Sequence, residues 1–85
     1  MSYYTYILFS EKTQRYYIGS TQNIQTRINR HNAGATKSTR TGRPWKLVYS
    51  EKFNSRSDAV KRENHIKKMK NKMWIENLIK EKSGT

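Results

Sequence analysis

The spacing of apolar and polar positions predicts a β-hairpin at the start of the chain and a third strand in its middle. Aromatic and β-branched residues crowd positions 3–9 and return at positions 16–18 after a polar stretch, which is typical of two strands joined by a turn. Strand character resumes over residues 45–53. Gly19 ends the second predicted strand, and a glycine there indicates that another group approaches the backbone closely.

A first helix is predicted over residues 22–32, with Thr21 as its N-cap. Ile24 and Ile28 recur at i, i+4 and would pack on the sheet. Residues 33–44 contain mostly Gly, Thr, Ser, Lys and Arg, with nothing to bury. This segment is therefore expected to form a basic surface loop.

A second helix is predicted to begin at the capping-box pattern of residues 55–58 and to run to about residue 70. Its expected inward stripe consists of Ala59, Glu63, Ile66 and either Met69 or Lys70. A carboxylate in such a stripe is unusual, because burying an unpaired charge costs on the order of several kcal/mol. Glu63 is either a boundary residue paired with Lys67 one turn later or the acid of a functional site.

A last helix is predicted after Asn71, with a core-facing stripe of i, i+4 pairs: Trp74 with Leu78 and Ile75 with Ile79. Residues 1–80 would form a single domain and residues 81–85 a frayed tail. The predicted order is β-β-α-β-α-α. It describes an α+β fold in which three helices flank a small, mostly antiparallel three-stranded sheet.

Composition restricts the classes of function. A hydrophobic fraction of 33% in 85 residues supports one modest core. The longest apolar runs are far shorter than the roughly 20 residues of a transmembrane helix, and no secretory pattern opens the chain, so a cytoplasmic location is expected. The absence of cysteine excludes disulfides, thiolate zinc sites and thiol nucleophiles.

The charge distribution points to a polyanionic partner. Eighteen Lys and Arg stand against six Asp and Glu, which leaves a net charge of +12, and no acidic residue lies between Lys12 and Ser50. Such an imbalance is most simply explained by nucleic acid. An acidic membrane surface is the alternative, but the chain lacks a terminal basic amphipathic helix with a broad apolar face. No membrane association is therefore expected.

The segment most suited to binding a nucleic-acid strand is residues 36–46. Lys37, Arg40 and Arg43 recur every three residues and would track successive phosphates, with Lys46 beside them. Trp45 would offer a ring for base stacking if it were exposed. A buried position in the third strand accounts for this tryptophan equally well.

Several short motifs, taken in their order and spacing, resemble the GIY-YIG nuclease family. These motifs are Tyr4-Thr5-Tyr6, Tyr17-Ile18-Gly19, Arg27 with His31, and Glu63 in the second long helix. The chain is most similar to the short stand-alone bacterial, UPF0213-like members, and the resemblance extends over residues 3–79. The first motif departs from Gly-Ile-Tyr, although its final tyrosine is kept.

The resemblance implies hydrolysis of phosphodiester bonds with one divalent metal, Mg²⁺ or alternatively Mn²⁺, held by Glu63. It implies that Arg27 contacts the scissile phosphate. Tyr6 would be the better candidate for the general base and Tyr17 for a positioning residue, provided that nearby cations favour the phenolate. His31 would relay the proton, bind phosphate or simply pack on the helix surface.

Three classes of function follow from these observations. The leading hypothesis is a metal-dependent endonuclease for structured or single-stranded sites, with DNA preferred over RNA. The alternative is a catalytically silent DNA- or RNA-binding adaptor of the same fold, and a ribosome-associated protein is a third. The complete set of expected catalytic residues favours the endonuclease. A protein partner or a second copy of the chain would have to add sequence specificity.

Overall fold

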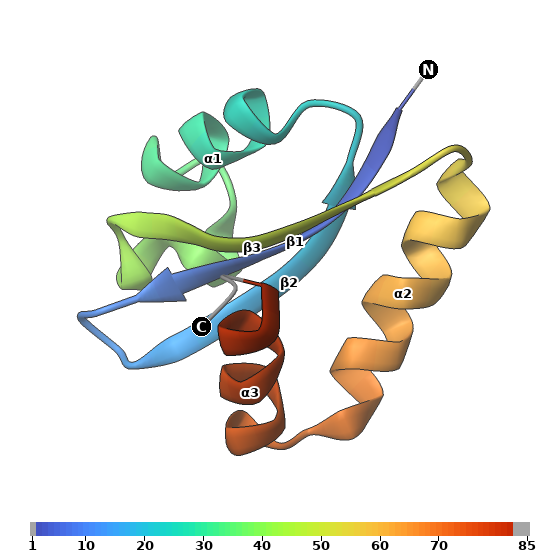
Figure 1. Cartoon of the computed structure of the whole chain (residues 1–85). Helices are drawn as coiled ribbons and strands as arrows, with labels where there is room; N and C mark the ends of the chain where they lie inside the picture. The colour runs from blue at the N-terminus through green and yellow to red at the C-terminus, as the bar shows by residue number, and fades with distance from the viewer. Residues whose placement is uncertain (1, 83–85) are drawn as a thin grey trace.

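The computed structural model describes residues 2–82 as a three-stranded sheet with helices on both of its faces (Figure 1). The strands are β1 (Tyr3–Ser10), β2 (Arg15–Thr21) and β3 (Trp45–Phe53). They lie in the order β2-β1-β3 and all neighbouring pairs are antiparallel. The predicted α+β class and the N-terminal hairpin are confirmed, and β2 is an edge strand.

The helices divide between the two faces of the sheet. Helix α1 (Ile24–Asn32) covers one face, seen above the sheet in Figure 1, and the short 3₁₀ helix η1 (Lys37–Gly42) packs against α1. Helices α2 (Arg56–Met69) and α3 (Lys72–Lys82) cover the other. The order of strands and long helices is as predicted, with η1 added inside the expected loop. No helix in the described part of the chain is long and apolar enough to cross a membrane.

The first helix begins two residues later than predicted because Asn23, not Thr21, is its N-cap. Asn23 Oδ1 accepts a hydrogen bond from the Thr26 amide at 3.0 Å. Both residue types can cap a helix, and here Thr21 Oγ1 instead accepts from the Asn23 amide at 3.2 Å. At α2 the predicted cap is confirmed, since Ser55 Oγ accepts from the Asp58 amide.

One part of the core lies between the sheet and the helices α2 and α3. Its buried residues are Ile7, Ile18, Tyr49, Ile66 and Ile75, with Trp74, Leu78 and Ile79 packed against them. The predicted stripe of α3 is therefore confirmed. In α2, Met69 is 38% exposed, and Lys70 is exposed with left-handed backbone. One of these two residues was expected to complete the inward stripe, and neither does, because the helix ends there.

The C-terminal helix extends further than the sequence indicated. Glu81 and Lys82 belong to α3, and the predicted fraying of the tail stays a prediction. Residues 83–85 lie outside the described residues.

The other part of the core lies under α1 and consists of Tyr6, Leu8 and Trp45, with Tyr17, Ile24 and Ile28 packed against them. Two of the predicted catalytic residues thus belong to this second cluster.

Candidate active site

The candidate site lies at the edge strand β2, where the central strand places Tyr6 directly opposite Gly19. A Cβ atom at position 19 would lie 2.6 Å from the Tyr6 hydroxyl oxygen and 2.7 Å from the ring carbon that carries it. These contacts are too short for any side chain, so only glycine lets the phenol lie across β2. The close approach predicted at Gly19 is confirmed, and it carries the Tyr6 hydroxyl to the edge strand.

Behind this phenol, the ring of His31 on α1 contacts β1 through one nitrogen and η1 through the other. Its Nε2 lies 3.4 Å from the Tyr6 hydroxyl, and its Nδ1 lies 2.8 Å from Thr39 Oγ1. Thr39 Oγ1 donates its proton to the Thr36 carbonyl at 3.3 Å, so it accepts from Nδ1–H. In the neutral form of the ring these contacts place the proton on Nδ1 and leave Nε2 to accept from the Tyr6 hydroxyl.

His31 is 1% exposed, which contradicts the alternative of packing on the helix surface. Burial lowers the pKa of His31, and the positive charge of Arg27 lowers it further. Both effects favour the neutral form of the ring. A role of His31 in relaying the proton or in binding phosphate stays a prediction.

Tyr17 packs over the same histidine. The two ring centroids are 4.6 Å apart, and Tyr17 also contacts Tyr6 and Trp45 at centroid distances of 6.3 and 6.4 Å. The ring of Tyr17 is half-buried and follows Tyr6 along one face of the sheet. This position agrees with the expected role in positioning rather than in proton transfer.

Arg27 lies beside Tyr6 but does not make it acidic. Burial raises the pKa of Tyr6 well above its ordinary value, and Tyr17 and Glu63 raise it further. Arg27 lowers this pKa through its charge and a hydrogen bond, and the balance still favours the protonated phenol. Arg27 by itself therefore does not favour the phenolate as expected, because the effect of burial on the pKa of Tyr6 is larger than that of Arg27.

Glu63 reaches the same strand from the opposite face of the sheet. Ser20 Oγ donates to Glu63 Oε1 at 2.7 Å, and Lys67 Nζ donates to Oε2 at 2.6 Å. The carboxylate is thus paired with Lys67, as one of the two alternatives predicted. It also points to Ser20, which follows Gly19 in β2. Its side chain is 16% exposed, and its charge acts on Tyr6.

The donors around Glu63 fit a magnesium ion. Within residues 2–82 no group of three or more His, Asp and Glu side chains could hold a metal. The available set is one carboxylate with the Ser20 hydroxyl beside it. Mg²⁺ commonly keeps several water ligands and takes other oxygens from substrate phosphates, so one carboxylate is sufficient. An ion at this carboxylate would compete with the ammonium group of Lys67.

The segment expected to be a loop forms the helix η1, which has a buried side and a charged side. Thr39 and Gly42 are buried, whereas Lys37 and Arg40 are exposed. Because a 3₁₀ helix repeats every three residues, each pair lies on one side. The prediction of a loop was wrong because Thr39 and Gly42 do have partners to pack against. The prediction that the cations of this segment lie on the surface is confirmed by the exposed Lys37 and Arg40.

Trp45 is one of those partners. It is 7% exposed, its Nε1 donates to the Thr39 carbonyl at 2.7 Å, and its ring lies against Gly42. Trp45 is therefore a buried strand residue, and the alternative of base stacking on an exposed ring is wrong. Lys46 is exposed and forms an ion pair with Glu11. Its contact with a nucleic-acid strand stays a prediction.

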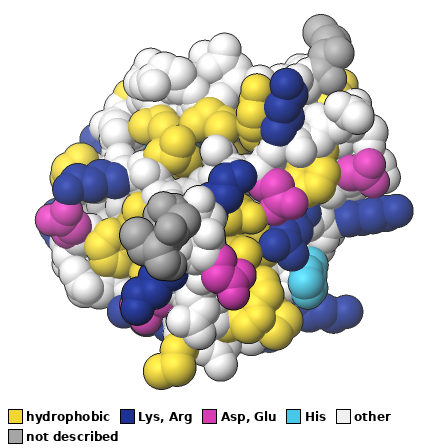
Figure 2. Space-filling view, viewed as in Figure 1, with side chains coloured by type: hydrophobic (Ala, Val, Ile, Leu, Met, Phe, Trp, Pro, Cys, Tyr) yellow, Lys and Arg dark blue, Asp and Glu magenta, His cyan; other side chains and the backbone are white. Residues whose placement is uncertain are grey.

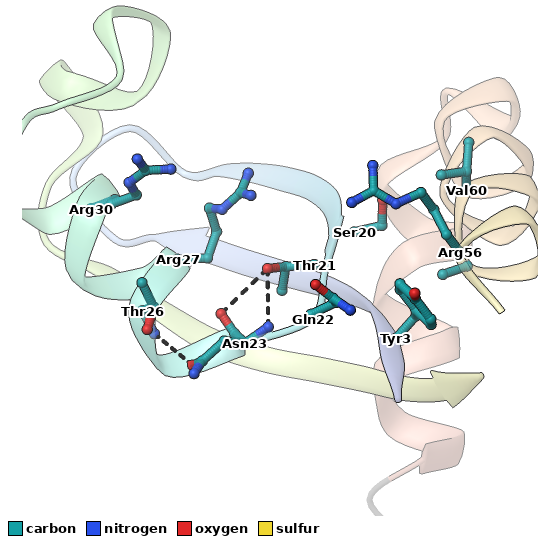
Figure 3. Close-up of a pocket in the computed structure, with 11 residues that line it drawn as sticks. Tyr3, Ser20, Thr21, Gln22, Asn23, Thr26, Arg27, Arg30, Arg56 and Val60 are labelled. Carbon is teal, nitrogen blue, oxygen red and sulfur yellow. Dashed lines mark hydrogen bonds between the residues drawn. The ribbon is translucent and has the colours of Figure 1, made fainter. Parts of the chain in front are cut away.

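A cavity of about 440 Å³ adjoins Ser20 and Arg27 between α1 and α2 (Figure 3). Arg30 of α1 and Arg56 from the first turn of α2 also line it, and neither was singled out from the sequence. The i, i+3 spacing of the two arginines in α1 was a readable signal. Arg56 was not, since its position depends on how α2 packs against the sheet.

Charges on the face that carries α3 are arranged differently. Figure 2 shows Lys and Arg side chains interspersed there with Asp and Glu. The cavity between α1 and α2, in contrast, has three arginines in its wall. An anionic ligand is therefore better matched by the cavity than by the α3 face.

Comparisons with known proteins agree with this architecture. The GIY-YIG catalytic domain family matches residues 2–80. A UPF0213 protein of Staphylococcus haemolyticus is 47% identical over 66 residues, or 76% of this chain and 79% of that protein. One of Natronomonas pharaonis is 36% identical over 83 residues, or 96% and 95%. The solution NMR structure of a UPF0213 protein from Bacillus halodurans matches with a TM-score of 0.61 and 32% identity, covering 99% of this chain and 88% of that one.

Proposed function

This chain belongs to the GIY-YIG family, and on that premise we propose that it is a metal-dependent endonuclease for single-stranded or structured DNA. The observation that carries the proposal is the meeting of two groups at β2. The Tyr6 phenol reaches this strand from one face and the Glu63 carboxylate from the other. A surface that only binds nucleic acid has no need of a buried Tyr6-His31-Thr39 chain.

Each side chain has a role that its surroundings support. Glu63, with Ser20 beside it, would hold Mg²⁺ or Mn²⁺, and such an ion stabilises charge on the departing 3′ oxygen. Arg27 binds the non-bridging oxygens of the scissile phosphate, because a guanidinium group is always charged and matches phosphate with two parallel hydrogen bonds. Lys67 has to release the carboxylate when the ion binds.

Proton transfer from the attacking water passes through Tyr6. The phenol oxygen accepts a proton from water while its own proton moves to Nε2 of His31, so the phenol need not ionise beforehand. Thr39 holds the ring in the tautomer that leaves Nε2 free to accept. The new bond joins the water oxygen to phosphorus and the bond to the 3′ oxygen breaks. The 3′ oxygen takes up a proton from solvent water and His31 later returns its proton to solvent through Tyr6, so that a 5′-phosphate and a 3′-hydroxyl result.

The alternative is a silent DNA- or RNA-binding adaptor, and the observation in its favour is the Glu63–Lys67 ion pair. In that case Lys67 is a permanent partner of the carboxylate and not one that an ion displaces. The preference for DNA over RNA and the cytoplasmic location stay predictions.

A panel of labelled substrates separates the two functions. Wild-type protein is incubated with single-stranded, duplex, flap and branched DNA, and with RNA, in Mg²⁺, Mn²⁺ or EDTA. We expect cutting only with metal. Glu63→Gln should abolish cutting and keep its affinity for the strand, whereas the exposed control Glu81→Gln, with the same change of charge, should cut normally. A wild-type protein that binds these substrates and cuts none of them is an adaptor.

A further inference from the structure

The cavity between α1 and α2 carries positive charge on two opposing walls. Figure 3 shows Arg27 and Arg30 extending from α1 on one side and Arg56 from α2 on the other, and Ser20 also lines the cavity. Within residues 2–82 no Asp or Glu lines this cavity. Three guanidinium groups around one space of about 440 Å³ repel one another unless an anion lies between them.

The cavity is continuous with the candidate active site. Ser20 lines the cavity and donates to the carboxylate of Glu63. Arg27 also lines it, and the proposed function assigns this residue to the scissile phosphate. A strand whose scissile phosphate lies on Arg27 therefore has its next backbone phosphate within this space or at its mouth.

We propose that the cavity binds the phosphate adjacent to the scissile one, with Arg30 and Arg56 as its ligands. This inference rests on the proposed function and adds a substrate requirement to it. A strand must carry a phosphodiester beside the bond that is cut, so internal bonds of a nucleic-acid strand are preferred. A dinucleoside monophosphate, which has one phosphate, is a poor substrate.

Binding without metal tests this subsite independently of catalysis. Arg30→Gln and Arg56→Gln each remove one positive charge, and Lys52→Gln on β3, at the far edge of the sheet, is the matched control. Fluorescence anisotropy with a single-stranded oligonucleotide in EDTA gives affinity and its salt dependence. We expect each arginine variant to lose about three- to tenfold in affinity and about 0.7 in salt slope. Lys52→Gln should match the wild type.

A neutral methylphosphonate placed at successive positions of the oligonucleotide then identifies the contact. At one position it should weaken wild-type binding and add nothing in Arg56→Gln, which is the coupling expected of direct partners. Equal penalties in both proteins at every position would overturn the subsite. So would an Arg56→Gln protein that binds like Lys52→Gln. A thermal melt of each variant confirms that it is folded.

Cleavage kinetics complete the test. With Mg²⁺, Arg30→Gln and Arg56→Gln should raise KM while kcat stays as in the wild type, since the flanking phosphate does not react. A fall in kcat at unchanged KM would overturn the assignment. If the wild type cuts nothing but the methylphosphonate coupling is present, the anion site stands and the endonuclease proposal fails.

Discussion

Replacing Gly19 by alanine should damage both packing and chemistry, because the added methyl group occupies the space of the Tyr6 phenol. The Cβ atom would lie 2.6 Å from the hydroxyl oxygen and 2.7 Å from the adjoining ring carbon. An ordinary contact needs about 1 Å more, and the ring cannot simply swing outward since Tyr6 is 1% exposed. Either the phenol or the strand β2 must move.

The expected cost follows from that displacement. Forcing a methyl group into a packed core costs about 1–3 kcal/mol, offset by roughly 0.5–1 kcal/mol that alanine gains over glycine in a strand. We expect a net loss of about 1–2 kcal/mol, or a decrease in Tm of about 5–15 °C for a domain of this size. A displacement of about 1 Å in a catalytic group lowers kcat about 100-fold.

Urea denaturation and single-turnover cleavage measure the two effects separately. The same substitution in a Tyr6→Leu background provides the control, because the aromatic ring that clashes is then gone and Gly19→Ala should no longer destabilise. The reasoning would be refuted by a Gly19→Ala protein as stable as the wild type. It would also be refuted if the stability loss were equally large in the Tyr6→Leu background.

Three further predictions concern the groups around this phenol and the helix η1. The free energy of unfolding should fall as pH decreases below about 6.5, because the unfolded state takes up a proton that buried His31 resists. Urea denaturation at several pH values should show that this free energy depends less on pH in His31→Gln than in the wild type, whereas exposed His65→Gln should behave like the wild type. Lys67→Gln should bind Mn²⁺ about two- to fivefold more tightly than the wild type, because the ion no longer competes with an ammonium group. Calorimetry measures this affinity, and exposed Lys68→Gln should bind like the wild type. Equal affinities of Lys67→Gln and the wild type would contradict this competition. The double substitution Arg40→Gln and Arg43→Gln should reduce the salt slope of DNA binding by about 1.4 for single strands and 1.8 for duplex, and an unchanged slope would remove η1 from the binding surface.

The strands, the long helices and the positions of Gly19 and Glu63 could be predicted because their signals are local or motif-like. Ser55 precedes its helix with the expected spacing, and Gly19 interrupts a strand where a side chain would collide with Tyr6. Glu63 stands out since it is the one acid in an otherwise apolar stripe. Such features depend on near neighbours in sequence or on a pattern repeated along one element.

The remainder depends on contacts between distant residues. The helix η1 forms because Thr39 meets His31 and Trp45, and nothing in its small polar residues indicates those partners. The raised pKa of Tyr6 likewise follows from burial under α1. The cavity requires α1 and α2 to lie on either side of the end of β2. A single sequence holds no local signal for these arrangements.

The position of the site on β2 limits how copies of this protein can associate. For the proposed endonuclease, a strand added along the free edge of β2 would lie beside Gly19 and Ser20, where the nucleic acid has to approach. Sheet extension compatible with activity is therefore restricted to β3, where exposed Lys46 and Lys52 discourage edge-to-edge pairing by charge. A peptide that pairs with β2 is accordingly expected to inhibit the proposed cleavage by backbone recognition alone.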